Sequence, residues 1–137
     1  MNSLKDYILE KFQITKDSKL PYKYYPKDKF ELRKILEERL AEDKNADLND
    51  IDVSDITDMG YEGFPKNAGL FEDLDPHNIK IDQWDVSKVR DMTAMFFGCE
   101  KFTGEGLENW KPINCEDMDW MFTKCNSLKR KPSWYHE

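Results

Sequence analysis

The sequence predicts an α/β fold: a short solenoid of repeated short parallel strands and short helices, preceded by an N-terminal helical cap. Three observations predict it. Residues 47–128 hold three imperfect copies of one pattern, each copy combines apolar residues two apart with apolar residues three apart, and an amphipathic segment precedes the copies. At 137 residues, with 39% hydrophobic and 13% aromatic residues, the chain has the apolar content of one packed domain.

The charge distribution supports a division into cap, repeats and tail. Residues 1–44 hold eleven basic and nine acidic residues, whereas residues 45–137 hold ten basic and nineteen acidic residues, within a net charge of −7. We therefore expect a cap at 1–46, three leucine-rich-like repeats at 47–128, and a tail at 129–137 that closes the last repeat. Polar caps are needed at the ends of repeat stacks.

The cap contains two helical patterns. The first is carried by Leu4, Tyr7, Ile8 and Phe12. The second is expected at about 28–43, because Asp28 with Glu31 three residues later forms a capping-box pattern. Its apolar stripe consists of Leu32, Ile35, Leu36 and Leu40. This second helix therefore has one side to bury against the repeats.

The three repeats begin at Leu48, Ile81 and Leu107, with offsets of 33 and 26 residues. The longer offset indicates an insertion of about eight residues at 61–68. Periods in the twenties with a Leu-x-x-Leu-x-Leu start are typical of leucine-rich solenoids. In an extended strand, residues two apart point the same way. The predicted inward pairs are Ile51 and Val53, Trp84 and Val86, and Trp110 and Pro112.

A helical turn is expected after each strand, because the next apolar residues come at intervals of three to four. In the second repeat these are Val89, Met92, Met95 and Phe96. Asp58, Asp91 and Asp117 stand where they can cap the turns. One unit cannot bury its apolar side alone, so stacking of the copies would create the core.

Residues 84–99, Trp-Asp-Val-Ser-Lys-Val-Arg-Asp-Met-Thr-Ala-Met-Phe-Phe-Gly-Cys, resemble the repeat of BspA-like leucine-rich repeat proteins. These occur as bacterial surface proteins, in mycoplasmas, and as short phage or mobile-element copies. The resemblance covers about residues 47–128, although Lys111, Pro112 and Cys115 replace the usual Asp, Val and Val. It implies protein–protein contact or adhesion, without a shared catalytic centre.

The outward side of the strands is the first candidate binding surface. Its residues are Asn49, Asp50, Asp52, Asp82, Gln83, Asp85, Glu108, Asn109 and Lys111. Stacking would align them in three rows dominated by acids and amides, a surface that suits a basic protein partner. The competing interpretation is a merely solubilising face. The inserted loop is the second candidate, with Tyr61 and Phe64 as exposed aromatic anchors.

No pattern points to catalysis, so we expect no catalytic residues, metal or cofactor. His77 and His136 have no nucleophile in recognisable order nearby. Cys99 and Cys125 share one repeat position, which favours a buried ladder of small side chains; zinc binding or a disulfide between them are the alternatives. The acidic run at 47–58 lacks the glycine and the final glutamate of a calcium loop.

The predicted function is that of a non-catalytic protein–protein interaction module. The alternatives are an acidic mimic of nucleic acid that inhibits a DNA- or RNA-binding enzyme, or a phage accessory or virion protein. The net negative charge argues against direct nucleic-acid binding, and no apolar run is long enough to predict membrane insertion. The expected location is the cytoplasm, with a virion as the alternative.

Overall fold

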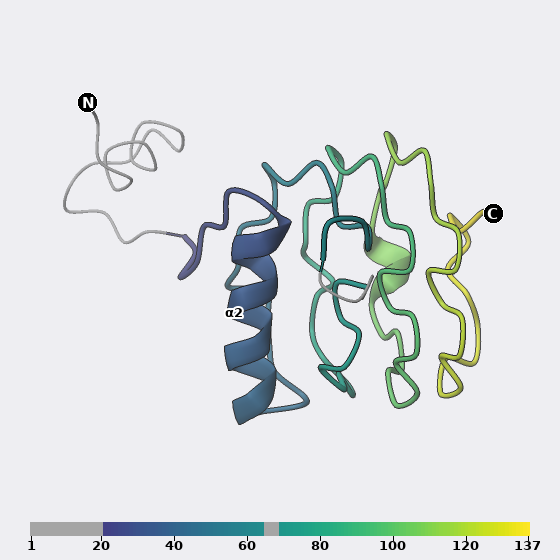
Figure 1. Ribbon diagram of the computed structural model, residues 1–137, viewed down its shortest axis with the longest axis horizontal. Helices are drawn as coiled ribbons and strands as arrows, with labels where there is room; N and C mark the ends of the chain where they lie inside the picture. Colours follow the sequence, from purple (N-terminus) through teal and green to yellow (C-terminus); the bar gives the residue numbers. More distant parts are fainter. Residues whose placement is uncertain (1–20, 65–68) are drawn as a thin grey trace.

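The computed structural model describes residues 21–64 and 69–137. The described chain winds into a stack of irregular coils, with one helix lying against the N-terminal end of the stack (Figure 1). We call residues 45–64 with 69–74 coil 1, residues 78–102 coil 2, and residues 104–128 coil 3. The helices are α2 (Lys29–Glu42) and the short 3₁₀ helix η2 (Leu107–Asn109). Within the described ranges the backbone forms only isolated parallel bridges, not strands.

The predicted α/β solenoid of short parallel strands and short helices is therefore wrong. No sheet forms in the described chain, and the segments expected to be helical turns after each strand contain turns alone. Neighbouring coils meet at isolated bridges: Asp47 with Lys80 and Asp58 with Asp91 between coils 1 and 2, and Asp91 with Asp117 between coils 2 and 3. Tyr24, which precedes α2, forms a further bridge with Ile51 of coil 1.

Left-handed backbone positions explain why neither strands nor helices extend. Ala94 and Trp120 occupy the same place in coils 2 and 3, with φ of 56° and 59°. Gly98 and Lys124 form a second matched pair, with φ of 73° and 62°. A residue in this conformation cannot continue a right-handed helix or an extended strand. Each coil therefore turns again after a few residues.

The coils nevertheless stack in the register that the repeat alignment predicts. Asp58, Asp91 and Asp117, the aligned aspartates, are joined by two of the parallel bridges. Each carboxylate accepts a hydrogen bond from the backbone N–H two residues later, at 2.8, 2.8 and 3.0 Å respectively. They stabilise turns instead of helices.

Helix α2 confirms the predicted second helix. Asp28 is its N-cap, and the Asp28 carboxylate accepts hydrogen bonds from the backbone N–H groups of Phe30 and Glu31. The buried side of α2 consists of Lys29, Leu32, Leu36 and Leu40. The helical pattern from Leu4 to Phe12 lies outside the described residues.

Aromatic ladders run through the core along the stack. The ring centroids of Trp84 and Trp110 are 6.1 Å apart, and Trp134 of the tail adds a third ring 5.9 Å from Trp110. Beside them, Phe96 lies between Phe71 and Phe122, at 4.8 and 5.8 Å. Of the predicted inward pairs, five residues are buried and Pro112 is only half-buried. Equivalent residues thus pack on one another from coil to coil.

Cys99 and Cys125 form the predicted buried ladder. Both are free thiols, and each donates to the carbonyl of the stacked phenylalanine one coil earlier: Cys99 to Phe71 at 3.6 Å and Cys125 to Phe96 at 3.0 Å. Burial raises the pKa of both thiols, that of Cys125 to about 11. Both thiols therefore stay protonated at neutral pH.

The described part of the chain was also compared with the requirements for a membrane-spanning helix. Across residues 21–64 and 69–137, no helix combines the length and the apolar character needed to cross a bilayer.

Candidate functional site

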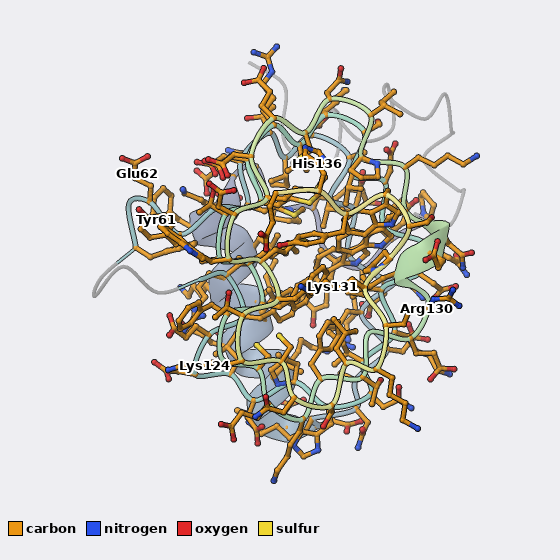
Figure 2. All side chains as sticks on the ribbon, turned by 90° about the vertical axis from the view of Figure 1, so that its right-hand side faces the viewer. Tyr61, Glu62, Lys124, Arg130, Lys131 and His136 are labelled. Atoms are coloured by element: carbon orange, nitrogen blue, oxygen red, sulfur yellow. The ribbon has the colours of Figure 1, made fainter. Side chains whose placement is uncertain are left out.

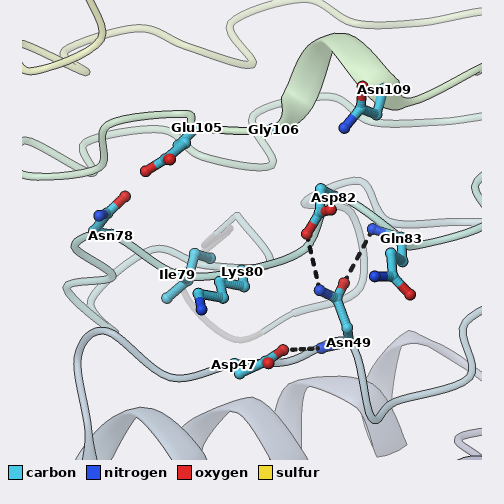
Figure 3. Close-up of a pocket in the computed structure, with 10 residues that line it drawn as sticks. All are labelled: Asp47, Asn49, Asn78, Ile79, Lys80, Asp82, Gln83, Glu105, Gly106 and Asn109. Atoms are coloured by element: carbon cyan, nitrogen blue, oxygen red, sulfur yellow. Dashed lines mark hydrogen bonds between the residues drawn. The ribbon is translucent and has the colours of Figure 1, made fainter.

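An acidic groove of about 500 Å³ crosses the first two coils and the start of the third (Figure 3). Its lining is almost entirely polar. The lining residues are Asp47, Asn49, Asn78, Ile79, Lys80, Asp82, Gln83, Glu105, Gly106 and Asn109. No aromatic side chain contributes, so a ligand here would be held by hydrogen bonds and charge.

Asn49 organises the groove through three hydrogen bonds, two of them between coils. Its side-chain amide donates to the Asp82 carboxylate at 2.9 Å, and its amide oxygen accepts from the backbone N–H of Gln83 at 3.0 Å. Its own backbone N–H donates to the Asp47 carboxylate at 3.1 Å. Figure 3 shows these contacts along one side of the groove. They fix two carboxylates at defined positions before any partner arrives.

The charge of the groove is negative. Asp47, Asp82 and Glu105 face a single cation, Lys80, among the lining residues. Asp82 is half-buried, whereas Asp47 and Glu105 are exposed. Carboxylates around a concave surface concentrate the field and attract cationic groups.

Gly106 allows coil 3 to approach Asp82 closely. Its φ is 85°, and a Cβ added there would lie 2.6 Å from the Cβ of Asp82. Any other residue would be strained in this backbone conformation and would push the coils apart. The glycine thus sets the width of the groove.

The structure gathers part of the predicted strand-face set in this groove: Asn49, Asp82, Gln83 and Asn109. The other lining residues were missed by sequence reasoning. Asp47, Lys80 and Gly106 occupy one shared repeat position, just before the Leu48, Ile81 and Leu107 starts. Extending the aligned rows by one residue upstream would have found them.

Three predicted residues serve the fold instead of the groove. Asp50 is half-buried in an ion pair with Arg39 of α2, at 2.9 Å. Asp52 was predicted to point outward, but it is only 7% exposed, and its carboxylate accepts from the backbone N–H of Ser54. Asp85 makes the equivalent turn with Ser87, at 3.0 Å. These carboxylates are committed to turn formation and helix attachment.

Glu108 and Lys111 also lie outside the groove. The Glu108 carboxylate accepts from the backbone N–H and the hydroxyl of Ser133, both at 2.7 Å, and these bonds lower its pKa. Glu108 thus holds the tail on coil 3. Lys111 lines a second, more apolar hollow of about 270 Å³ together with Trp84 and Ile113.

The inserted loop differs from the prediction at one of its two aromatic anchors. Phe64 is buried, because its ring packs edge-on against Phe30 of α2 with centroids 5.3 Å apart. Tyr61 is partly exposed and projects from the stack beside Glu62 (Figure 2). The rest of the predicted loop, residues 65–68, lies outside the described residues.

Neither histidine joins a constellation of catalytic type in the described ranges. His77 contacts Asp75 at 3.1 Å, and His136 lies in the tail. Over residues 21–64 and 69–137, no group of three or more His, Cys, Asp or Glu side chains is placed to hold a metal ion.

Comparison with known proteins gives one family. The family model described as "Mycoplasma protein of unknown function, DUF285" matches residues 31–136, from the first turn of α2 to the tail. No curated protein matches the chain. No solved structure matches it either.

Proposed function

Because this chain belongs to the DUF285 family of mycoplasma proteins of unknown function, whose model covers α2 and all three coils, we propose a function for it from the groove. It acts as a non-catalytic protein–protein interaction module, and its acidic groove receives a basic segment of a partner protein. The single observation that carries this proposal is the negative, hydrogen-bonded groove around Asn49 and Asp82.

The groove supports a basic protein segment by its chemistry. A lysine or arginine side chain entering it would meet Asp82 and Glu105 from adjacent coils, and arginine can pair with a carboxylate through two parallel hydrogen bonds. The surrounding amides of Asn49, Gln83 and Asn109 offer both donors and acceptors to a peptide backbone. Asn49 already orients the Asp82 carboxylate, so little ordering cost remains for that group at binding.

We also propose kinship with the BspA-like repeat proteins, supported by the pattern at 84–99. That kinship implies contact with other proteins and agrees with an interaction module. The proposed kinship rests on the sequence pattern of the repeats and on the stacking of the coils. It does not include leucine-rich strands.

The test measures binding of a fluorescein-labelled peptide of alternating arginine and serine by anisotropy, with a glutamate–serine peptide as the reference. We expect the Asp82→Asn, Glu105→Gln double variant to bind the arginine peptide about tenfold more weakly. The matched control is Asp73→Asn with Glu100→Gln, which removes the same charge from a different face. This control should bind like the unchanged protein.

If both double variants bind the arginine peptide equally weakly, the groove is not the specific binding site and this part of the proposal is wrong. It would mean that the whole acidic surface attracts cations, which is the behaviour expected of the nucleic-acid-mimicking alternative. In that case competition with DNA for a DNA-binding enzyme becomes the informative measurement, and its salt dependence should be steep.

A further inference from the structure

Along one side of the stack, alternate residues from Met92 to Gly98 and their equivalents in coil 1 donate backbone hydrogen bonds in one direction, toward the following coil. Four backbone N–H groups of coil 2 donate to carbonyls of coil 3: Met92 to Asp117, Ala94 to Asp119, Phe96 to Met121 and Gly98 to Thr123, at 2.8 to 3.0 Å. Coil 1 donates to coil 2 in the same way, from Met59, Tyr61 and Phe71. Along this side, each coil therefore offers carbonyls toward the N-terminal end and N–H groups toward the C-terminal end.

At the N-terminal end, α2 satisfies the carbonyls with cations. Lys29 donates from its ammonium to the carbonyls of Gly60, at 3.2 Å, and Glu62. The Arg33 guanidinium donates to the carbonyls of Gly69, Leu70 and Glu72, at 3.2, 2.8 and 2.8 Å. In the repeat alignment, Gly60, Leu70 and Glu72 correspond to residues of coils 2 and 3 whose backbone carbonyls accept hydrogen bonds from the preceding coil. Positively charged side chains thus stand in for the N–H groups of an absent coil.

At the C-terminal end, the matching donors have no acceptor. The backbone N–H groups of coil 3 equivalent to the four donors of coil 2 belong to Met118, Trp120, Phe122 and Lys124. Within residues 21–64 and 69–137, none of these N–H groups donates a hydrogen bond. We call residues 118–124 the open edge. A row of unpaired N–H groups is a template for pairing with an added segment of backbone.

The tail covers a different part of this end. Trp134 stacks on Trp110 with centroids 5.9 Å apart, and Tyr135 packs edge-on against the Phe122 ring at 5.2 Å. These contacts close the core beneath the end coil. They supply no hydrogen-bond acceptor to the open edge.

The side chains at this end favour an acidic partner. Residues 120–136 contain no Asp or Glu, but contain Lys124, Lys129, Arg130 and Lys131. Figure 2 views this end and shows Lys124, Arg130 and Lys131 on it. Trp120, which carries one of the free N–H groups, is 57% exposed where coil 2 has the buried Ala94. An exposed tryptophan is a typical anchor of protein interfaces.

We propose that the open edge binds an acidic segment of another protein, which adds as a further coil parallel to residues 118–124. Backbone carbonyls of the segment accept from the four N–H groups, and its carboxylates pair with the cations. Glu116, Asp117 and Asp119 precede the positive region, so the acidic residues of the segment lie toward its C-terminal half. The surface is independent of the acidic groove and opposite to it in charge.

A second copy of this chain is a poorer occupant. Two open edges placed face to face would oppose N–H groups to N–H groups, which cannot pair. The carbonyl-bearing end of coil 1, which could pair with the open edge of another copy, is covered by α2 through Lys29 and Arg33.

The test is an amide exchange and NMR titration of the full chain with two capped peptides of one composition. The probe is Val-Ser-Val-Ser-Val-Glu-Val-Glu, and the control is the reversed peptide, Glu-Val-Glu-Val-Ser-Val-Ser-Val. We expect the probe to bind about tenfold more tightly than the reversed peptide. At saturation it should slow exchange of the four open-edge amides at least tenfold, while amides of Gln83 and Asn109 in the groove stay unchanged.

Two substitutions test the edge without disturbing the coil, because each introduces the residue that coil 2 has at the same position. Trp120→Ala and Lys124→Gly together should weaken the probe at least tenfold. Lys101→Gly is the control for loss of one exposed lysine and should leave binding unchanged.

Several results would overturn the proposal. These are equal affinity for the two peptides, protection that appears in the groove instead of the open edge, or unchanged binding by the double variant. Sedimentation velocity tests the alternative that a second copy of this chain occupies the open edge. If the protein is a dimer and Trp120→Ala converts it to a monomer, the open edge binds a second copy and the proposal is wrong.

Discussion

Trp84 and Trp110 stack with their ring planes 9° apart, and each indole N–H donates to a backbone carbonyl one coil nearer the N-terminus. Trp84 donates to Leu48 at 2.9 Å and Trp110 to Ile81 at 2.7 Å. Trp134 repeats the contact with Leu107 at 2.7 Å. The ladder therefore satisfies the polar atom of each buried indole while its rings fill the core.

Replacing Trp110 with alanine should destabilise the fold by about 3–5 kcal/mol, because the residue stacks on both neighbours and leaves a large cavity. Urea unfolding followed by circular dichroism measures the loss. Trp120→Ala is the matched control and should change stability by less than about 1 kcal/mol, since its side chain is mostly exposed. Similar losses in the two variants would contradict the ladder.

Gly69 lies so close to coil 2 that a side chain cannot fit. A Cβ added there would be 1.8 Å from the backbone carbonyl oxygen of Ala94, so Gly69→Ala should cost at least about 3 kcal/mol. Gly98→Ala meets no atom within 4 Å but keeps a φ of 73°, so it should cost only about 1 kcal/mol. Thermal unfolding of both variants checks the difference, and equal midpoints would argue against the close approach.

Lys29 is a buried cation whose loss should detach the start of α2. Its ammonium contacts the Asp58 carboxylate at 2.6 Å and two carbonyls of coil 1. Lys29→Met preserves the length of the side chain but leaves these acceptors unpaired, so we expect a loss of about 2 kcal/mol. Lys34→Met, at an exposed position of the same helix, should be within about 0.5 kcal/mol of the unchanged protein.

Stability should fall as the pH rises above about 9. Burial raises the pKa of Cys115 and Cys125 from 9.0 to about 11 in the folded protein. Between these values the unfolded chain releases thiol protons that the folded chain retains, so the unfolded state gains stability. Below pH 9 the thiols are protonated in both the folded and the unfolded state, so they do not make the free energy of unfolding depend on pH.

Urea midpoints between pH 8 and 11 measure this effect, in reducing buffer. The expected decline should be smaller in Cys125→Ala, compared with its own midpoint at pH 8. A decline of the same size in that variant would assign the pH dependence to other groups.

The sequence predicts which residues of neighbouring coils meet, but it does not predict the backbone conformation at those contacts. The aligned Asp58, Asp91 and Asp117 are bridged as the repeat offsets require, and the capping pattern of Asp28 and Glu31 locates α2. The strands and helical turns fail because apolar spacing reports which side chains are buried, not which backbone conformation buries them. A left-handed Ala94 or Trp120 has no signature of that kind.

The candidate site shows the same limit. Asn49 and Asp82 were found because outward rows follow from stacking, and they do meet in the groove. Asp50 and Phe64 were misplaced because their partners, Arg39 and Phe30, come from α2, and the repeat pattern does not state where that helix lies. The free N–H groups of the open edge are a backbone property, which a list of side chains cannot reveal.

The indole ladder ties every layer to its neighbours in both directions. Each buried indole uses the preceding coil as its acceptor, whereas backbone N–H groups of coils 1 and 2 use the following coil. Removal of any one coil would therefore leave unpaired polar groups in the coils beside it. The coils should consequently unfold together as one cooperative unit.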